Sequence, residues 1–184
     1  LLHESKDNDS LRGEVDFFRG YFNYFQNRGN LSLKHLMRAL EQTPAASYEV
    51  RGQIEILLGL ALQMQGKEKK ATDNLHAALN RLLPEEGVIK TRLLVTLVYI
   101  YVIAGRLGQA FSVAHSLSEF AEKRGYLYAK QWGVYLQGLI HYYRNDVEEA
   151  IDCFSQALEH EHILHARAVI DSMAGLMIAY HANG

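Results

Sequence analysis

The chain has 184 residues, of which 48% are hydrophobic and 22% are charged, and its formal net charge is −2. This balance argues against non-specific nucleic-acid binding, which needs a clustered Lys/Arg face, and the single cysteine, Cys153, excludes a disulfide framework and a cysteine metal cluster. The chain opens with no signal peptide, and its apolar runs at 54–64 and 93–104 are shorter than the roughly 20 residues that cross a bilayer, so we expect a cytoplasmic protein.

Small residues recur along the chain with a period of 39 to 40 residues, which is typical of helical repeats. The markers are Gly66, Gly105, Asn145 and Gly184 in one set, Ala71, Ala110 and Ala150 in a second, and the pairs Gly59 with Gly138 and Ala78 with Ala157 in a third. They predict four helix–turn–helix units and one partial unit, at residues 11–44, 47–84, 87–124, 127–161 and 163–184.

In the first unit, we expect a helix at 11–27, a turn at Gly29 and a short helix at 31–42 before Pro44. In the second, a helix at 51–65 ends at Gly66, and a helix at 68–83 carries a helical stripe that includes Ala71, Leu75 and Ala78. Pro84 ends that helix.

The third unit repeats this pattern at 91–104 and 108–124, and the fourth at 130–144 and 147–160. Asp146 and Glu149 form a capping-box pattern at the start of the last of these helices. Residues 166–183 predict a first helix without its partner. Because the chain begins at Leu1 and stops in a half repeat, we interpret it as one repeat domain excised from a larger protein.

These units predict an all-α, right-handed superhelical solenoid of antiparallel helix pairs, since a single pair cannot bury its own apolar faces. The fourth unit resembles the tetratricopeptide repeat (TPR). The residues that carry this resemblance are Gly138, Tyr142, Asn145, Asp146, Ala150, Phe154 and Ala157. The units are five or six residues longer than the roughly 34-residue TPR.

Units of this length are similar to the effector-sensing region of MalT-like transcriptional activators, ATP-binding regulators of the LuxR superfamily. The strings that carry the resemblance are LRGE at 11–14, RALE at 38–41, LLGLA at 57–61, AGL at 174–176 and ANG at 182–184. The resemblance implies binding of a small-molecule inducer or a regulatory protein, coupled to nucleotide-dependent self-association.

The resemblance also implies ATP as a cofactor of the parent protein only. This sequence contains no GxxxxGK[ST] loop and no basic recognition helix. We therefore expect no cofactor, no enzymatic activity, no membrane contact and no direct nucleic-acid binding from this chain.

Counting back from each turn predicts the residues that point from the first helices into a concave groove. These are Asp16, Arg19, Asn23, Gln26, Gln53, Gln63, Arg92, Tyr99, Trp132, Tyr135, Tyr142, Asp171 and His181. Aromatic faces beside planar hydrogen-bonding groups suit a sugar, a metabolite or a peptide. No residue is predicted to be catalytic or to bind a metal.

Several alternatives stay open from the sequence. Trp132, Tyr135, Leu139 and Tyr142 have the spacing of an inter-repeat packing stripe. Arg19 and Asn23 could begin a carboxylate clamp for a chaperone tail, and the histidines at 160–165 could hold a metal, although a solvated turn fits them better. The main alternative function is a general scaffold that binds a peptide or a partner helix.

Overall fold

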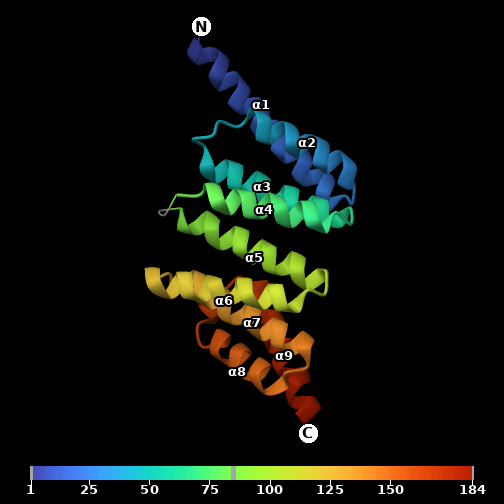
Figure 1. The fold of residues 1–184 in the computed structure, drawn as a ribbon, viewed down its shortest axis with the longest axis vertical. Helices are drawn as coiled ribbons and strands as arrows, with labels where there is room; N and C mark the ends of the chain where they lie inside the picture. Colours follow the sequence, from blue (N-terminus) through green and yellow to red (C-terminus); the bar gives the residue numbers. More distant parts are fainter. Residues whose placement is uncertain (1, 84–85, 184) are drawn as a thin grey trace. The chain divides into compact units, whose positions relative to one another are not determined.

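The structure, a computed structural model, describes residues 2–83 and 86–183, with side chains described for 11–83 and 86–181. Over these residues it contains nine α-helices, one short 3₁₀ helix and no strand, so the all-α prediction is confirmed (Figure 1). The α-helices are α1 (Leu2–Phe25), α2 (Gly29–Gln42), α3 (Tyr48–Met64), α4 (Glu68–Arg81), α5 (Gly87–Ile103), α6 (Leu107–Arg124), α7 (Leu127–Arg144), α8 (Val147–Leu158) and α9 (Ala166–Asn183), and the 3₁₀ helix is η1 (Glu161–Ile163).

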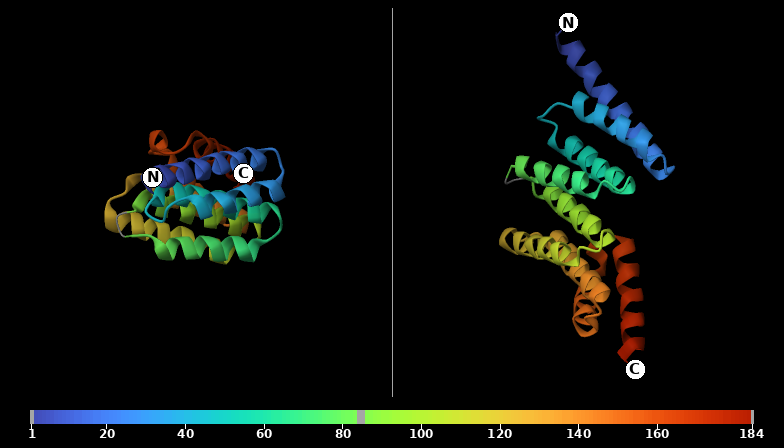
Figure 2. Two further views of the ribbon diagram at one scale, coloured as in Figure 1. Left: turned by 90° about the horizontal axis from the view of Figure 1, so that it is seen from above. Right: turned by 45° about the vertical axis from the view of Figure 1, so that its right-hand side comes forward.

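The chain forms two compact units, residues 1–96 and 97–184, and the division between them falls inside α5. In the first unit, α2 packs against α1 and α3, and α3 packs against α4. In the second, α7 packs against α6, α8 and α9, and α8 packs against α9. Figure 2 shows the helices from two further directions. The expectation of one continuous repeat domain stays a prediction.

Three of the predicted turn residues adopt the left-handed conformation that ends a helix. Gly66 has φ +68°, Gly105 has φ +70° and Asn145 has φ +66°. Glycine reaches this region without steric cost, and asparagine is one of the few other residues that visits it. The predicted turns of the second, third and fourth repeats are therefore confirmed, whereas Gly184 lies outside the described residues.

The predicted turn of the first repeat is wrong. The left-handed residue is Asn27, with φ 61°, and Gly29 is already the first residue of α2. Turn residues 27, 66, 105 and 145 now follow one another at steps of 39, 39 and 40 residues. The corrected register also places Gly20 at the position of Gly59, seven residues before the turn, and buried Ser32 at the position of Ala71.

In the first unit, one cluster of core residues lies between α2 and α3. Its buried members are Leu33, Leu36, Ala39, Ile54, Leu57, Leu58 and Ala61, and Phe17 and Tyr24 of α1 pack against them. Small residues let the paired helices come close. A Cβ added to Gly20 would lie 2.6 Å from Leu36 Cγ, and one added to Gly59 would lie 3.2 Å from Leu75 Cδ1.

In the second unit, α7 is buried on several sides. Tyr135, Leu136 and Ile140 on α7 and Phe154 on α8 are at most 1% exposed. A Cβ on Gly175 of α9 would lie 2.4 Å from Phe154 Cε2, so α9 approaches α8 closely.

Several predicted helix ends differ from the structure. Helices α1, α3, α5 and α7 begin three or more residues earlier than predicted, and α8 ends at Leu158, two residues before its predicted end. Helix α4 ends at Arg81, two residues earlier than predicted. The next residue, Leu82, is extended (φ −70°, ψ 140°). Pro84 disfavours helical geometry at Leu83, the residue directly before it, which stops the helix close to its observed end. Helix α8 begins after Asp146 as predicted, but the Asp146 carboxylate does not cap it. Its Oδ2 lies 3.0 Å from His141 Nδ1 instead.

Within the described part of the chain, no helix combines the length and the apolar content that crossing a bilayer requires.

Candidate interaction surface

One face of each first helix carries most of the predicted groove residues. We call it the first-helix face and define it as the residues 13, 10, 6 and 3 positions before each turn residue. In the first unit these are Glu14, Phe17, Tyr21 and Tyr24 on α1, Gln53, Ile56, Leu60 and Gln63 on α3, and Arg92 and Val95 on α5. In the second unit they are Tyr99 and Val102 on α5, Trp132, Tyr135, Leu139 and Tyr142 on α7, and Asp171, Ala174, Ile178 and His181 on α9.

The corrected turn changes which residues of α1 belong to this face. Asp16, Arg19, Asn23 and Gln26 were derived from Gly29, so each is two residues out of register. Two residues correspond to about 200° around a helix. Arg19 Nη1 lies 3.9 Å from Asp16 Oδ1, and Asn23 Nδ2 donates to the Arg19 carbonyl at 2.8 Å. Gln26 is exposed.

Gln53 and Arg92 come together at one hollow of the first unit. They occupy equivalent positions on α3 and α5 and line a volume of about 280 Å³. The other lining residues are Glu49, Val50, Val88 and Ile89. The Arg92 side chain is exposed, and its guanidinium has no hydrogen bond or ion pair with residues 11–83 or 86–181. The hollow therefore combines apolar walls with an available cation.

In the second unit, three predicted groove residues are joined by hydrogen bonds. Tyr99 donates to the Tyr135 hydroxyl at 3.4 Å, and Tyr135 donates to Asp171 Oδ2 at 3.0 Å. Burial raises the pKa of both tyrosines, and the neighbouring Asp171 carboxylate raises them further. Tyr135 is 0% exposed, so it has the inter-repeat packing role that the sequence left open and is not on the surface. Arg167 Nε lies 3.6 Å from Asp171 Oδ2.

Two other residues of the face have buried polar atoms that lack a partner in the described structure, namely Trp132 Nε1 and Gln63 Oε1. Each unsatisfied buried group costs about 1–3 kcal/mol. The Trp132 ring packs edge to face against Tyr135 at 5.7 Å, whereas half-buried Tyr142 contacts the neighbouring Tyr143 ring at 5.8 Å. Trp132 is therefore also largely a packing residue.

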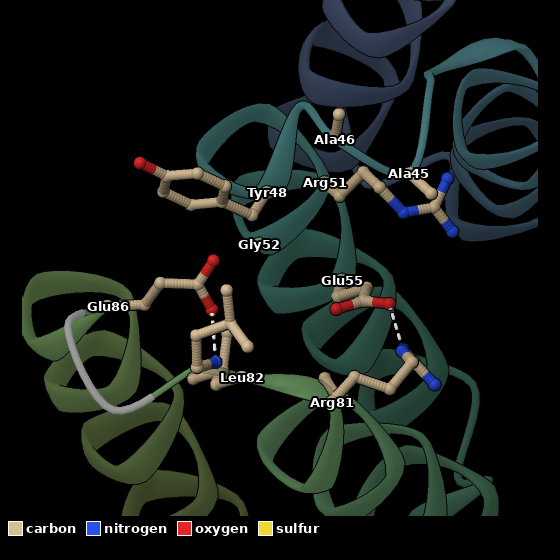
Figure 3. A pocket seen from close by; sticks show the side chains of 11 residues that line it. Ala45, Ala46, Tyr48, Arg51, Gly52, Glu55, Arg81, Leu82 and Glu86 are labelled. Carbon is tan, nitrogen blue, oxygen red and sulfur yellow. Dashed lines mark hydrogen bonds and ion pairs between the residues drawn. The ribbon is translucent and has the colours of Figure 1, made fainter.

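A hollow of about 460 Å³ lies in the first unit and was not predicted (Figure 3). Its charged lining residues are Arg51, Glu55, Arg81 and Glu86. All four have partners within the protein. Arg51 Nη1 donates to the Leu40 and Thr43 carbonyls at 2.9 and 2.6 Å, which caps the end of α2.

Glu55 and Arg81 form an ion pair, and Glu86 Oε2 accepts a 2.7 Å hydrogen bond from the backbone N–H of Leu83. The polar groups of this hollow are thus occupied, and we assign them a structural role. One signal was present in the sequence. Glu55 interrupts an apolar run at 54–58, and a carboxylate on a buried face requires a cationic partner.

Among the described residues, the histidines at 160–165 and Cys153 do not form one cluster. His160 and His162 have ring centroids 6.2 Å apart beside η1, and His165 Nδ1 accepts from the Arg167 N–H at 3.3 Å. Among the described side chains, no three His, Cys, Asp or Glu residues cluster as metal ligands. Burial raises the pKa of the Cys153 thiol, with Asp152 and Glu149 adding to the effect, so its reactive thiolate is disfavoured.

Comparison with known proteins identifies the fold. The structure is similar to the nearly identical TPR-like repeats of a candidate kinesin light chain from Podosopora anserina (TM-score 0.69, 16% identity, covering 95% of this chain and 88% of that one). It is also similar to BtubC (BKLC) from P. vanneervenii (TM-score 0.65, 16% identity, covering 100% and 85%). No family model and no curated protein sequence matches the chain. The fold is therefore a TPR-like helical repeat.

Proposed function

We propose that this chain is a non-enzymatic scaffold whose first-helix face binds a segment of a partner protein. The fold supports the proposal, because it is of the TPR-like kind. TPR-like solenoids generally present extended surfaces to protein partners. The observation that carries the proposal is the exposed Arg92 guanidinium, which has no hydrogen-bond or ion-pair partner among residues 11–83 and 86–181, at the edge of the hollow that it shares with Gln53.

The chemistry of this hollow indicates the kind of segment that it would accept. Val50, Val88 and Ile89 provide apolar contacts for one aliphatic or aromatic side chain. Arg92 can form a paired hydrogen bond with a carboxylate, and Gln53 can both donate and accept. Glu49 on the rim disfavours a second acidic residue on its side. A partner segment with one apolar residue next to one acidic residue fits best.

A displayed library of random 12-residue peptides, selected on the purified chain, tests this proposal. We expect the selected peptides to be enriched in Asp or Glu beside an apolar residue and to lose at least tenfold in affinity for the Arg92→Glu variant. Arg38→Glu is the matched control, because Arg38 is an exposed arginine on α2 away from the first-helix face. A failure to enrich peptides, or equal affinity for both variants, would refute the proposal.

A more specific role as the sensing domain of a MalT-like regulator has separate support. The repeat length of 39 to 40 residues and the strings LLGLA at 57–61 and RALE at 38–41 favour it. On this proposal the partner is a small-molecule inducer or a regulatory protein, and a cytoplasmic parent protein self-associates with ATP. The test is the complete polypeptide, which should contain a phosphate-binding loop before this region and a helix-turn-helix domain after it. A complete polypeptide that contains neither would reject this role and leave the scaffold intact.

A further inference from the structure

The hollow of about 460 Å³ in Figure 3 is built from the interior of the sequence, by residues between 45 and 86. The start of α3, the end of α4 and the residue directly before α5 line it. We call it the Glu86 hollow. Its volume falls in the range of about 300–1,000 Å³ that is typical of small-molecule sites. No described residue lines both this hollow and that of Gln53 and Arg92, so an inference from it does not rest on the proposed function.

Two carboxylates are buried in the wall of the Glu86 hollow. Glu55 is 5% exposed and Glu86 is 7% exposed. The ion pair with Arg81 balances the charge of Glu55. Glu86 has no ion pair with residues 11–83 or 86–181, and its one side-chain hydrogen bond there comes from the Leu83 N–H to Oε2. Burial removes the water that would solvate a carboxylate, so an unpaired charge in this position is costly. The internal hydrogen bonds therefore leave one negative charge without a counter-ion.

The second oxygen of the Glu86 carboxylate faces the hollow. Figure 3 shows that it is directed toward Gly52 and Tyr48, away from the oxygen that accepts from Leu83. Neither arginine of the hollow is directed toward it. The Arg81 guanidinium is directed to Glu55, and that of Arg51 donates to carbonyls at the end of α2. A cation that enters the hollow can therefore reach this oxygen.

The start of α5 balances only part of the Glu86 charge. Glu86 directly precedes Gly87, the first residue of α5, and the N-terminus of a helix favours a negative charge. The helix supplies roughly half of an elementary charge. The Glu86 carboxylate also accepts its hydrogen bond from Leu83, which lies before the helix, and not from an N–H group of α5. A full positive charge in the hollow remains favourable.

The remaining wall selects among possible cations. One oxygen of Glu86 is engaged by Leu83, whereas a guanidinium needs both oxygens for its paired hydrogen bonds. A primary ammonium is a compact charge that a single oxygen can bind. Ala78, Leu82 and Leu83 provide apolar contacts for an aliphatic chain, which is how lysine stems lie on apolar surfaces. The Tyr48 ring, 46% exposed in the lining, adds an aromatic face that attracts cations.

We propose that the Glu86 hollow binds a primary ammonium group at the end of an aliphatic chain. The ammonium donates to the second oxygen of Glu86, and the chain lies along Leu82 and Leu83. The ion pair of Glu55 with Arg81 keeps its structural role, because the ligand replaces neither partner. A lysine side chain and a free alkylamine present this same group, so both are sources of the ligand chemistry.

Nuclear magnetic resonance titration of the purified chain with n-pentylamine tests the proposal. We expect saturable shifts of the amide signals around the hollow, and at least tenfold weaker binding of 1-pentanol, which has the same chain without the charge. Glu86→Gln should weaken pentylamine binding at least tenfold, since the amide can still accept from Leu83 but carries no charge. Glu41→Gln is the matched control, because it removes an exposed carboxylate of α2 outside the hollow. Equal binding of pentylamine and pentanol, or equal pentylamine affinity of wild type and Glu86→Gln, would overturn the proposal.

A comparison on the wild-type chain keeps the proposal testable even if circular dichroism shows that Glu86→Gln does not fold. Pentanoate carries the opposite charge on the same kind of chain and should bind at least tenfold more weakly than pentylamine. Pentanoate binding that is as tight would show that an arginine recognises the ligand, and the proposal would fail. Capped lysine, Nα-acetyl-lysine methylamide, and cadaverine then distinguish the two sources. Tighter binding of capped lysine assigns the hollow to a protein side chain, and tighter binding of cadaverine assigns it to a free amine.

Discussion

The hydroxyl of Tyr135 on α7 donates a 3.0 Å hydrogen bond to the carboxylate of Asp171 on α9, 36 residues later in the chain. Tyr99 on α5, 36 residues earlier, donates in turn to Tyr135. One buried hydroxyl thus connects three successive first helices of the second unit. Because Tyr135 is fully buried, the hydrogen bonds are made away from water, where an unmade bond is costly.

Replacing Tyr135 with phenylalanine should destabilise the protein at neutral pH. The ring volume is kept, but Asp171 loses its donor and Tyr99 loses its acceptor, so we expect a loss of about 1–3 kcal/mol. Urea unfolding monitored by circular dichroism measures this difference. Tyr142→Phe is the control, because the half-buried Tyr142 forms no side-chain hydrogen bond with the described residues. Equal losses in both variants would contradict the assignment.

The buried Tyr135 hydroxyl also predicts how the stability of the protein depends on pH. Burial raises the pKa of Tyr135 above its ordinary value of 10.0, so the folded state holds this proton when the unfolded state has released it. The contribution to stability is complete below pH 10 and declines as the pH rises above 10. The stability difference between wild type and Tyr135→Phe should therefore shrink between pH 8 and pH 10.5 in urea melts. A stability difference that grows with pH would show that folding does not raise the pKa of Tyr135.

The left-handed turn at Asn27 predicts an unusual order of substitutions. Gly in place of Asn27 should be neutral or slightly stabilising, because glycine adopts φ 61° without strain. Alanine should cost about 1–2 kcal/mol, since its Cβ meets the following carbonyl in that conformation. Thermal melting of the two variants gives the order. Equal melting temperatures would contradict the assignment of the turn to Asn27.

This turn also explains how far the fold could be predicted. The period, the helices and three turns follow from small residues at fixed positions, since Gly66, Gly105 and Asn145 share both the spacing and the chemistry. In the first repeat the turn residue is an asparagine and a glycine follows two residues later. Composition therefore favoured Gly29, and only the backbone angles show that the glycine is inside α2.

The candidate site was less predictable because it depends on register and on side-chain partners. A two-residue error moved the predicted residues of α1 around the helix, whereas Gln53 and Arg92, counted from a correct turn, do share one hollow. Burial of Tyr135 could not be derived from spacing, since packing and groove residues have the same helical period. The exposure of Phe18 and Phe22 could not be derived either, because equivalent positions are buried in the other repeats.

Close helix contacts predict opposite effects for two glycines. Gly20→Ala should destabilise by about 1–3 kcal/mol, because its Cβ would lie 2.6 Å from Cγ of Leu36, which is fully buried and cannot move aside. Gly108→Ala is the matched control. A Cβ at Gly108 has no atom within 4 Å, and alanine has the higher helix propensity, so this variant should gain up to about 1 kcal/mol. Denaturant unfolding of both variants checks the prediction, and a stabilised Gly20→Ala variant would disprove the close contact.

The ion pair of Glu55 and Arg81 predicts that one substitution compensates for another. Glu55 is 5% exposed whereas the Arg81 side chain is 55% exposed, so Arg81→Ala leaves a buried carboxylate without its cation. We expect a loss of about 1–3 kcal/mol, less than for a fully buried pair because water reaches the arginine. Adding Glu55→Gln should recover part of that loss, since a neutral amide is less costly to bury than an unpaired charge. Unfolding free energies of the two single variants and the double variant give the coupling. If the double variant is as unstable as the sum of the single losses, the two side chains do not interact.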